Sequence, residues 1–132
     1  MSEWKNIPKD LTKYQGFVYK ITNKLNNKYY IGKKFFWSKK TLKPLKGKSR
    51  KRHFIVESDW KNYWGSSKEL LKDISEYGEE VFVREILFPC ETKFDCAYGE
   101  LKEQIDNNVL FDDNSYNGII NVRLRKPLRY RR

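Results

Sequence analysis

The sequence predicts an α+β domain with a small central antiparallel β-sheet flanked by helices. Three observations support this fold class: an alternating hairpin pattern at residues 16–32, an apolar strand pattern at 81–88, and two segments with helical spacing, 66–78 and 92–107. The elements follow one another as strand, strand, helix, strand, helix and strand. That order is typical of an α+β domain, and 132 residues suit a single one.

The first two strands are expected to form a hairpin. Residues 16–22 (GFVYKIT) alternate and place Phe17, Tyr19 and Ile21 on one face. The Asn-rich segment 23–27 supplies turn residues, and residues 28–32 (KYYIG) return as the second strand. Successive side chains of a strand point to opposite sides, so Tyr29 is expected on the face opposite to Tyr30.

The rest of the predicted domain consists of two helices and two strands. Ser66 and Glu69 form a capping-box pattern before an apolar stripe, and Gly78 ends that helix. Residues 81–88 (VFVREILF) are rich in β-branched and aromatic side chains and predict a central strand. A second helix is expected from Thr92 to about Asn107, and residues 116–122 predict a turn and a short last strand.

The chain divides into a domain and three attached segments. Residues 16–122 form the predicted domain, preceded by an N-terminal leader, 1–15. Within the domain, residues 33–52 are a basic insertion without clear periodicity, expected as an exposed loop. Residues 123–132 form a basic C-terminal arm.

Composition indicates a cytoplasmic protein. No segment reaches the roughly 20 apolar residues that a membrane helix requires, and the first residues lack the apolar core of a signal peptide. Cys90 and Cys96 are too few and too far apart for a disulfide framework or a metal knuckle. We expect them to be small buried side chains.

The distribution of charge indicates a nucleic acid partner. Lysine and arginine number 28 against 17 aspartates and glutamates, a net charge of +11. Ten basic and no acidic residues lie from Lys33 to Arg52, and six basic and no acidic residues from Asn121 to Arg132. Acid-free basic blocks favour a polyanion, and neither block has the apolar stripe of a membrane-surface helix. The predicted DNA contacts are Lys33, Lys34, Lys48, Arg50, Lys51, Arg123, Arg125, Lys126 and Arg129.

The segment GFVYKITNKLNNKYYIG, residues 16–32, resembles the opening hairpin of the GIY-YIG nuclease superfamily. Val18-Tyr19 occupies the I-Y position and Tyr30-Ile31-Gly32 is the YIG triplet, with the two tyrosines eleven positions apart. The resemblance covers about residues 16–122 and is closest to small phage homing-type endonucleases, apart from the basic insertion. It continues through YWGSS at 63–67, the strand VFVREIL, a helical glutamate and Tyr116-Asn117.

This resemblance implies an endonuclease that hydrolyses phosphodiester bonds of double-stranded DNA with one divalent metal ion, Mg²⁺ or Mn²⁺. It implies that Tyr19 is the general base or its relay, that Tyr30 supports it, and that Glu100 is the metal ligand, with Glu103 as the spare candidate. A phenol with a pKa near ~10 is a poor base at neutral pH and needs a neighbouring cation or metal-bound water. Without the motif, strand tyrosines would be read as packing residues.

The cationic group and Asn117 are less directly specified. Family members carry an arginine on a helix soon after YIG, where this chain has its basic insertion. We therefore assign Arg52 and His53, from SRKRHF, to the catalytic set, with Lys33 as the alternative. Asn117 is assigned to the site, although a role in bracing a turn before Gly118 fits equally well.

Other classes of protein fit less well. Glu100-Leu101-Lys102 is an E-x-K tripeptide, but PD-(D/E)xK nucleases carry it on a strand with an acidic partner upstream. HNH nucleases require several histidines, and His53 is the only one here. A catalytically inactive DNA-binding module with the GIY-YIG fold, and a restriction-like or loosely specific nuclease, stay open as alternatives.

Overall fold

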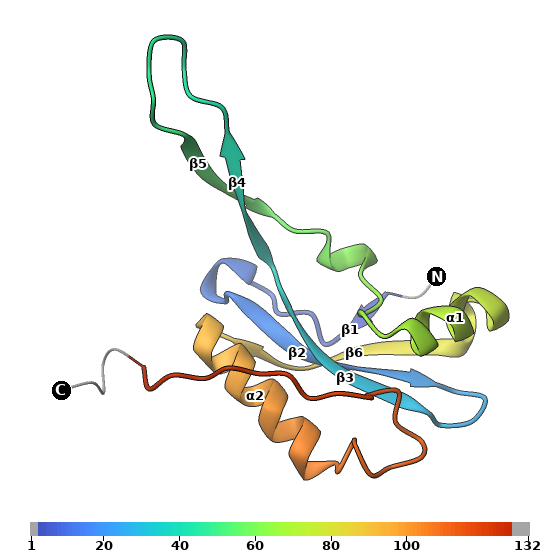
Figure 1. Cartoon of the computed structure of the whole chain (residues 1–132). Helices are drawn as coiled ribbons and strands as arrows, with labels where there is room; N and C mark the ends of the chain where they lie inside the picture. The colour runs from blue at the N-terminus through green and yellow to red at the C-terminus, as the bar shows by residue number, and fades with distance from the viewer. Residues whose placement is uncertain (1–2, 128–132) are drawn as a thin grey trace.

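The computed structural model describes residues 3–127, in which two helices and a four-stranded sheet form a body from which a β-hairpin projects (Figure 1). The strand order in the sheet is β1-β6-β2-β3, and β4 and β5 form the separate hairpin. The elements are β1 Trp4–Lys5, η1 Leu11–Lys13, β2 Gly16–Asn23, β3 Tyr29–Phe35, β4 Trp37–Leu42, β5 Arg52–Glu57, η2 Trp60–Asn62, α1 Lys68–Tyr77, η3 Glu79–Val81, β6 Phe82–Cys90 and α2 Lys93–Asp106.

The sheet confirms the predicted α+β class and the predicted β2–β3 hairpin. β2 lies in the centre and pairs antiparallel with both β3 and β6. The predicted leader also contributes, because Trp4–Lys5 (β1) pairs in parallel with β6. The sheet is therefore mixed rather than wholly antiparallel. The indole of Trp4 drives this addition, since it is 5% exposed and donates to the Trp60 carbonyl at 2.8 Å.

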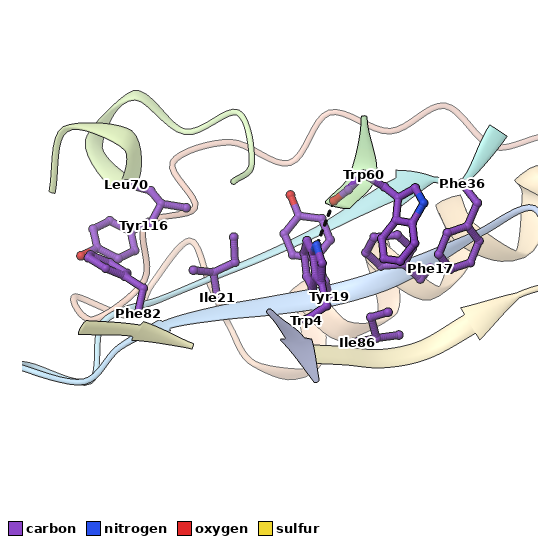
Figure 2. Packing of buried hydrophobic residues seen from close by; sticks show 10 residues of the cluster. All are labelled: Trp4, Phe17, Tyr19, Ile21, Phe36, Trp60, Leu70, Phe82, Ile86 and Tyr116. Carbon is purple, nitrogen blue, oxygen red and sulfur yellow. Dashed lines mark hydrogen bonds between the residues drawn. The ribbon is translucent and has the colours of Figure 1, made fainter. Parts of the chain in front are cut away.

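Two hydrophobic clusters cover the two faces of the sheet. The larger one holds Phe17, Tyr19 and Ile21 of β2 with Leu70 of α1 and Trp60 of η2 (Figure 2). The smaller one packs Val18, Tyr29 and Ile31 against Cys96 of α2. Tyr29 thus lies on the face opposite to Tyr19 and Tyr30, as the alternation predicts.

The basic insertion is not the irregular loop that its sequence suggested. Residues 37–42 and 52–57 pair antiparallel, from Trp37↔Glu57 to Leu42↔Arg52. The run of lysines hides this pattern, because the ribbon has no buried face that would impose an apolar alternation. Both strands are almost wholly exposed.

The predicted last strand, 116–122, is also absent from the described fold. At its start the segment meets the edge of β3 in a bridge between Tyr29 and Ser115, where Tyr29 N–H donates to the Asn114 carbonyl at 2.9 Å and Tyr116 N–H donates to the Tyr29 carbonyl at 2.7 Å. The next backbone groups of β3, those of Ile31, are bound by the side chain of Asn117 instead. The Asn117 side chain therefore ends the pairing with β3 at the place where the sequence predicts a last strand.

The helices largely agree with the sequence, with one shift in capping. Ser67, rather than Ser66, is the N-cap of α1, and its Oγ accepts from Leu70 N–H at 3.3 Å. Both cysteines are buried and free, as expected. No helix within residues 3–127 is long and apolar enough to cross a membrane.

Candidate active site

Tyr19 stands on the central strand with its ring in the larger core cluster. Only 1% of the residue is exposed, and its hydroxyl points away from the sheet (Figure 2). Trp4 packs edge-on against the ring at 5.3 Å between centroids. The phenol is consequently held in one orientation by rigid neighbours.

Tyr30 lies beside Tyr19 across the hairpin, with 6.1 Å between the ring centroids. Gly32, the third residue of YIG, lies under both rings. A Cβ at that position would come within 2.6 Å of the Tyr19 hydroxyl and 2.9 Å of the Tyr30 ring. Gly65 approaches the same rings from the loop before α1 and has a φ of +87°, which L-residues rarely adopt. The two glycines leave room for both phenols to meet at one place.

Two further hydroxyl groups, those of Tyr63 and Ser66, lie near the tyrosines, and the sequence did not assign either to the site. Tyr63 packs perpendicular to Tyr19, with 6.1 Å between the ring centroids. Ser66 Oγ lies 3.2 Å from the Tyr30 hydroxyl. Both belong to the YWGSS segment, so its place in the motif was the available signal.

Burial raises the pKa of both Tyr19 and Tyr30. It raises the pKa of Tyr19 well above its ordinary value, and the charges that Tyr30 and Tyr63 would carry raise it further. Burial also raises the pKa of Tyr30, although the hydrogen bond from Ser66 opposes that shift. Neither phenol therefore ionises at neutral pH without added positive charge nearby.

Glu100 projects from α2, which packs on the opposite face of the sheet. Its carboxylate lies 3.5 Å from Lys33 Nζ, and its side chain is 16% exposed. Burial raises the pKa of Glu100, while the Lys33 ammonium lowers it. The Glu100 charge in turn raises the pKa of both Tyr19 and Tyr30. Because β3 is the edge strand, groups from the two faces can meet around that edge.

Glu100 also fits the implied metal ion. Among residues 3–127, no group of three or more histidines, cysteines or acidic residues could form a closed metal cage. Mg²⁺ does not require one, since it keeps several waters and takes one or two carboxylates together with substrate phosphate. A largely buried carboxylate with a raised pKa gains from an added cation. One hard oxygen ligand at Glu100 is consistent with that mode of binding.

Asn117 holds the strand that carries YIG. Its Oδ1 accepts from Ile31 N–H at 2.9 Å, and its Nδ2 donates to the Ile31 carbonyl at 2.8 Å. Gln104 of α2 donates to the same carbonyl at 3.0 Å. The contacts of Asn117 are those of a positioning residue for β3.

Arg52 and His53 are not brought to the tyrosines. Both lie on β5, where Arg52 pairs with Leu42 at the outer end of the projecting hairpin (Figure 1). His53 Nδ1 lies 3.1 Å from Thr41 Oγ1 on the same ribbon. Their assignment to the catalytic set stays a prediction from sequence that these contacts do not support. The cation that the structure does bring to Glu100 is the alternative, Lys33.

The predicted DNA-contacting residues fall into three places. Lys33 and Lys34 lie on β3, and Lys34 Nζ is 2.7 Å from Asp59 and 4.2 Å from the centre of the Tyr63 ring. A second group occupies the exposed tip of the hairpin: Lys48, Arg50 and Lys51. A third group follows α2 on irregular backbone: Arg123, Arg125 and Lys126. Arg129 lies outside the described residues.

A comparison with known protein families gives a match over most of the chain. The family model described as "Putative endonuclease segE, GIY-YIG domain" matches residues 2–120. No curated protein and no solved structure gives a match.

Proposed function

The chain belongs to the GIY-YIG endonuclease domain family that matches residues 2–120, and from this premise we propose a divalent-metal-dependent endonuclease that hydrolyses double-stranded DNA. The observation that supports the proposal best is the meeting of the Tyr19 and Tyr30 phenols over Gly32, within the electrostatic reach of Glu100. We further propose a phage homing-type enzyme that acts in the cytoplasm of a bacterial or phage-infected cell.

Tyr19 is the proposed proton acceptor. Burial raises the pKa of Tyr19, so its hydroxyl keeps its proton at neutral pH in the free protein. Tyr19 would take the proton of an attacking water as a relay, passing its own proton on to solvent, when a bound metal ion or a nearby cation stabilises the phenolate. Tyr30, held by Ser66, orients the same water from the neighbouring strand.

Glu100 would hold the Mg²⁺ or Mn²⁺ ion. When bound, such an ion stabilises negative charge on a phosphate and lowers the pKa of water. The buried phenols make this role necessary, since neither has a lowered pKa of its own. Lys33, which neutralises Glu100 in this structure, is the proposed cation for the charge that develops on the phosphate.

A catalytically inactive DNA-binding module is the second candidate. It is favoured by the position of Arg52, which lies on the hairpin, while lysines 33 and 34 stand on the strand with the YIG triplet. Lysine presents a point charge to phosphate, whereas arginine can bind two oxygens at once. A chain that kept the fold and lost the catalytic arginine would have this arrangement.

A cleavage assay separates the two candidates. Supercoiled plasmid is incubated with the pure protein in Mg²⁺, Mn²⁺ or EDTA, and the cut ends are sequenced. We expect cutting only when metal is present and a loss of activity by orders of magnitude in Glu100→Ala. Glu103→Ala, at the spare candidate on the same helix, should cut nearly normally if Glu100 is the ligand, and the reverse pattern would assign the metal to Glu103. Equal cutting in EDTA or in Glu100→Ala would refute the metal role, and no cutting under any condition would favour the inactive module. The positions of the cut ends distinguish a site-specific enzyme from a restriction-like or loosely specific one.

A further inference from the structure

The β4–β5 hairpin has the dimensions and charge of a ribbon that enters a DNA groove. Its strands pair over six residues each, so at about 3.4 Å per residue the ribbon is roughly 20 Å long. It stands clear of the sheet (Figure 1). Between Trp37 and Glu57 there are eight lysines and arginines and one acidic residue, Glu57, at the base. This charge is complementary to a phosphate backbone.

The width of the ribbon selects one groove. Two paired strands lie about 4.8 Å apart, and their side chains extend the ribbon further on both sides. The major groove of B-DNA is about 12 Å wide and admits a two-stranded ribbon, whereas the minor groove is about 6 Å wide. The hairpin fits the major groove.

Cross-strand register divides the ribbon into two faces. One face carries the pairs Lys39↔Ile55 and Thr41↔His53. Near the base of the ribbon is a hollow of about 600 Å³, lined by Lys39, His53 and Ile55 of this face, by Ser38 and Phe54 of the other face, and by Thr12, Gln15 and Lys93 of the body. The other face carries the pairs Lys40↔Phe54 and Leu42↔Arg52, and we call these four residues the outer face.

The outer face combines cations with apolar groups that phosphate contacts do not require. Leu42 is 41% exposed and Phe54 42% exposed, beside the exposed Lys40 and Arg52. Phosphates are bound by positive and polar groups alone. In the major groove, by contrast, arginine or lysine pairs with guanine O6 and N7, and apolar side chains contact the thymine methyl group. The opposite face also exposes an apolar side chain, Ile55 at 73%, but its cation is a lysine, whereas this face carries Arg52, whose guanidinium can bind guanine O6 and N7 at once.

We propose that the outer face of the hairpin, Lys40, Leu42, Arg52 and Phe54, reads base sequence in the DNA major groove. The proposal rests on the proposed DNA substrate and gives the nuclease domain its own source of specificity. It separates recognition by the ribbon from chemistry at the β3 edge. Within the hairpin, it separates the outer face from the tip cations, which contact phosphates.

Binding selection tests the proposal without requiring cleavage. The full chain is incubated in EDTA with a randomised duplex library, and the bound fraction is sequenced. The tests are Arg52→Ala and Lys40→Ala; the controls are Lys39→Ala, the adjacent residue on the opposite face, and Lys48→Ala at the tip. Every variant removes one charge, so each should weaken binding to all sequences and lower the log–log salt slope by about 1. Only the outer-face variants should also lose base preference, by roughly 10-fold at the contacted position.

A chemical change in the DNA gives an independent readout. Duplex containing 7-deazaguanine lacks the N7 acceptor in the major groove and keeps its Watson–Crick pairs and minor groove. This substitution should weaken the guanine preference of the parent chain, and at the position that Arg52 contacts it should have no further effect on Arg52→Ala. An unchanged preference in Arg52→Ala and Lys40→Ala, or a parent chain without preference, would overturn the proposal. Loss of preference in Lys39→Ala instead would overturn the choice of face.

The two proposals fail in different ways. If the parent chain cuts DNA but the outer-face variants keep its base preference, the proposed nuclease activity is supported and the proposal that the hairpin reads bases is wrong. If the chain selects sequences through Arg52 and Lys40 but never cuts DNA, the proposal that the hairpin reads bases is supported and the proposed nuclease activity is wrong. Circular dichroism confirms folding, which these exposed positions should leave intact.

Discussion

Replacing Asn117 with alanine should loosen the YIG strand at one identifiable point. The change removes two hydrogen bonds, at 2.9 and 2.8 Å, from the N–H and carbonyl of Ile31. The carbonyl keeps its bond from Gln104. The N–H, on a residue that is fully buried, faces away from the β2 ladder and loses its acceptor. A buried donor without a partner costs about 1–3 kcal/mol beyond the lost bonds.

The matched control is Gln104→Ala, which removes a bond to the same residue. It leaves no buried group of Ile31 without a partner, because Asn117 still binds both the N–H and the carbonyl. We therefore expect Asn117→Ala to lower the free energy of unfolding by about 3 kcal/mol, and the lost hydrogen bond of Gln104→Ala to cost about 1 kcal/mol. Chemical denaturation of both variants measures this difference.

The cleavage rate then shows whether Asn117 positions the catalytic residues or only stabilises the fold. Single-turnover rates at saturating DNA are compared at a temperature where both variants are fully folded. A positioning role for Asn117 predicts a lower rate with little change in DNA affinity, since Tyr30 and Gly32 flank Ile31 on the loosened strand. Equal destabilisation by both variants would refute the unpaired-donor argument. An unchanged rate in folded Asn117→Ala would refute the positioning role.

Three further predictions concern the active site and the C-terminal arm. Tyr19→Phe keeps the ring and its packing, so the unfolding free energy should change by no more than about 1.5 kcal/mol while cleavage falls about 10²- to 10⁴-fold; parent-like cutting would make Tyr19 purely structural. Burial raises the pKa of Glu100 above its value in the unfolded chain, so ionisation of this carboxyl lowers the free energy of unfolding. Glu100→Gln should therefore stabilise the protein at neutral pH, and this gain should vanish as the pH falls from the raised pKa to that of an ordinary glutamate. Unfolding free energies of parent and variant with the same pH dependence would contradict this. Deleting residues 123–132 removes six positive charges and should lower the salt slope of DNA binding by at most about 5, and by about half of that if half the charges contact phosphate; saturated cleavage should stay near normal.

The parts of the fold that the sequence predicts are those with a buried face. The alternation of Phe17, Tyr19 and Ile21 corresponds to one side of a real cluster, and the apolar stripe of α1 buries Leu70. Where a strand has no buried face, its sequence shows no alternation of apolar and polar residues that would predict it. The hairpin strands expose nearly every side chain, so the lysine-rich segment 37–42 carries no alternation that would indicate a strand.

Site residues can be proposed from the sequence where a motif specifies them, and not where tertiary contacts do. The tyrosines and Glu100 are assigned from their places in the motif. In the structure Tyr19 and Tyr30 lie side by side across the β2–β3 hairpin, and Glu100 pairs with Lys33 of the edge strand β3. The cation does not follow, because nearness along the chain favoured Arg52 while the fold brings Lys33 to Glu100. The Asn117 bond to Ile31 spans 86 positions of the chain, so the sequence could assign Asn117 to the site or to a turn but could not indicate that it binds β3.

The base of the hairpin holds the outer face in a constant position relative to the tyrosines. The enzyme should therefore cut at a constant distance from the bases that the outer face recognises. Only the buried Phe36 separates β3 from β4. Trp37 Nε1 donates to the Tyr14 carbonyl at 2.9 Å, and Ser58 Oγ donates to the Phe35 carbonyl.

The double variant Trp37→Phe/Ser58→Ala removes both of these bonds and should weaken the attachment by about 2 kcal/mol. We expect the parent to cut at one offset from its preferred sequence and the double variant to cut at several. Trp64→Phe, a matched change at a tryptophan that stacks on Arg84, should keep the single offset. Sequenced cut ends measure the distribution. If the parent offset is already broad, or the double variant keeps one position, the hairpin and the tyrosines are not rigidly coupled.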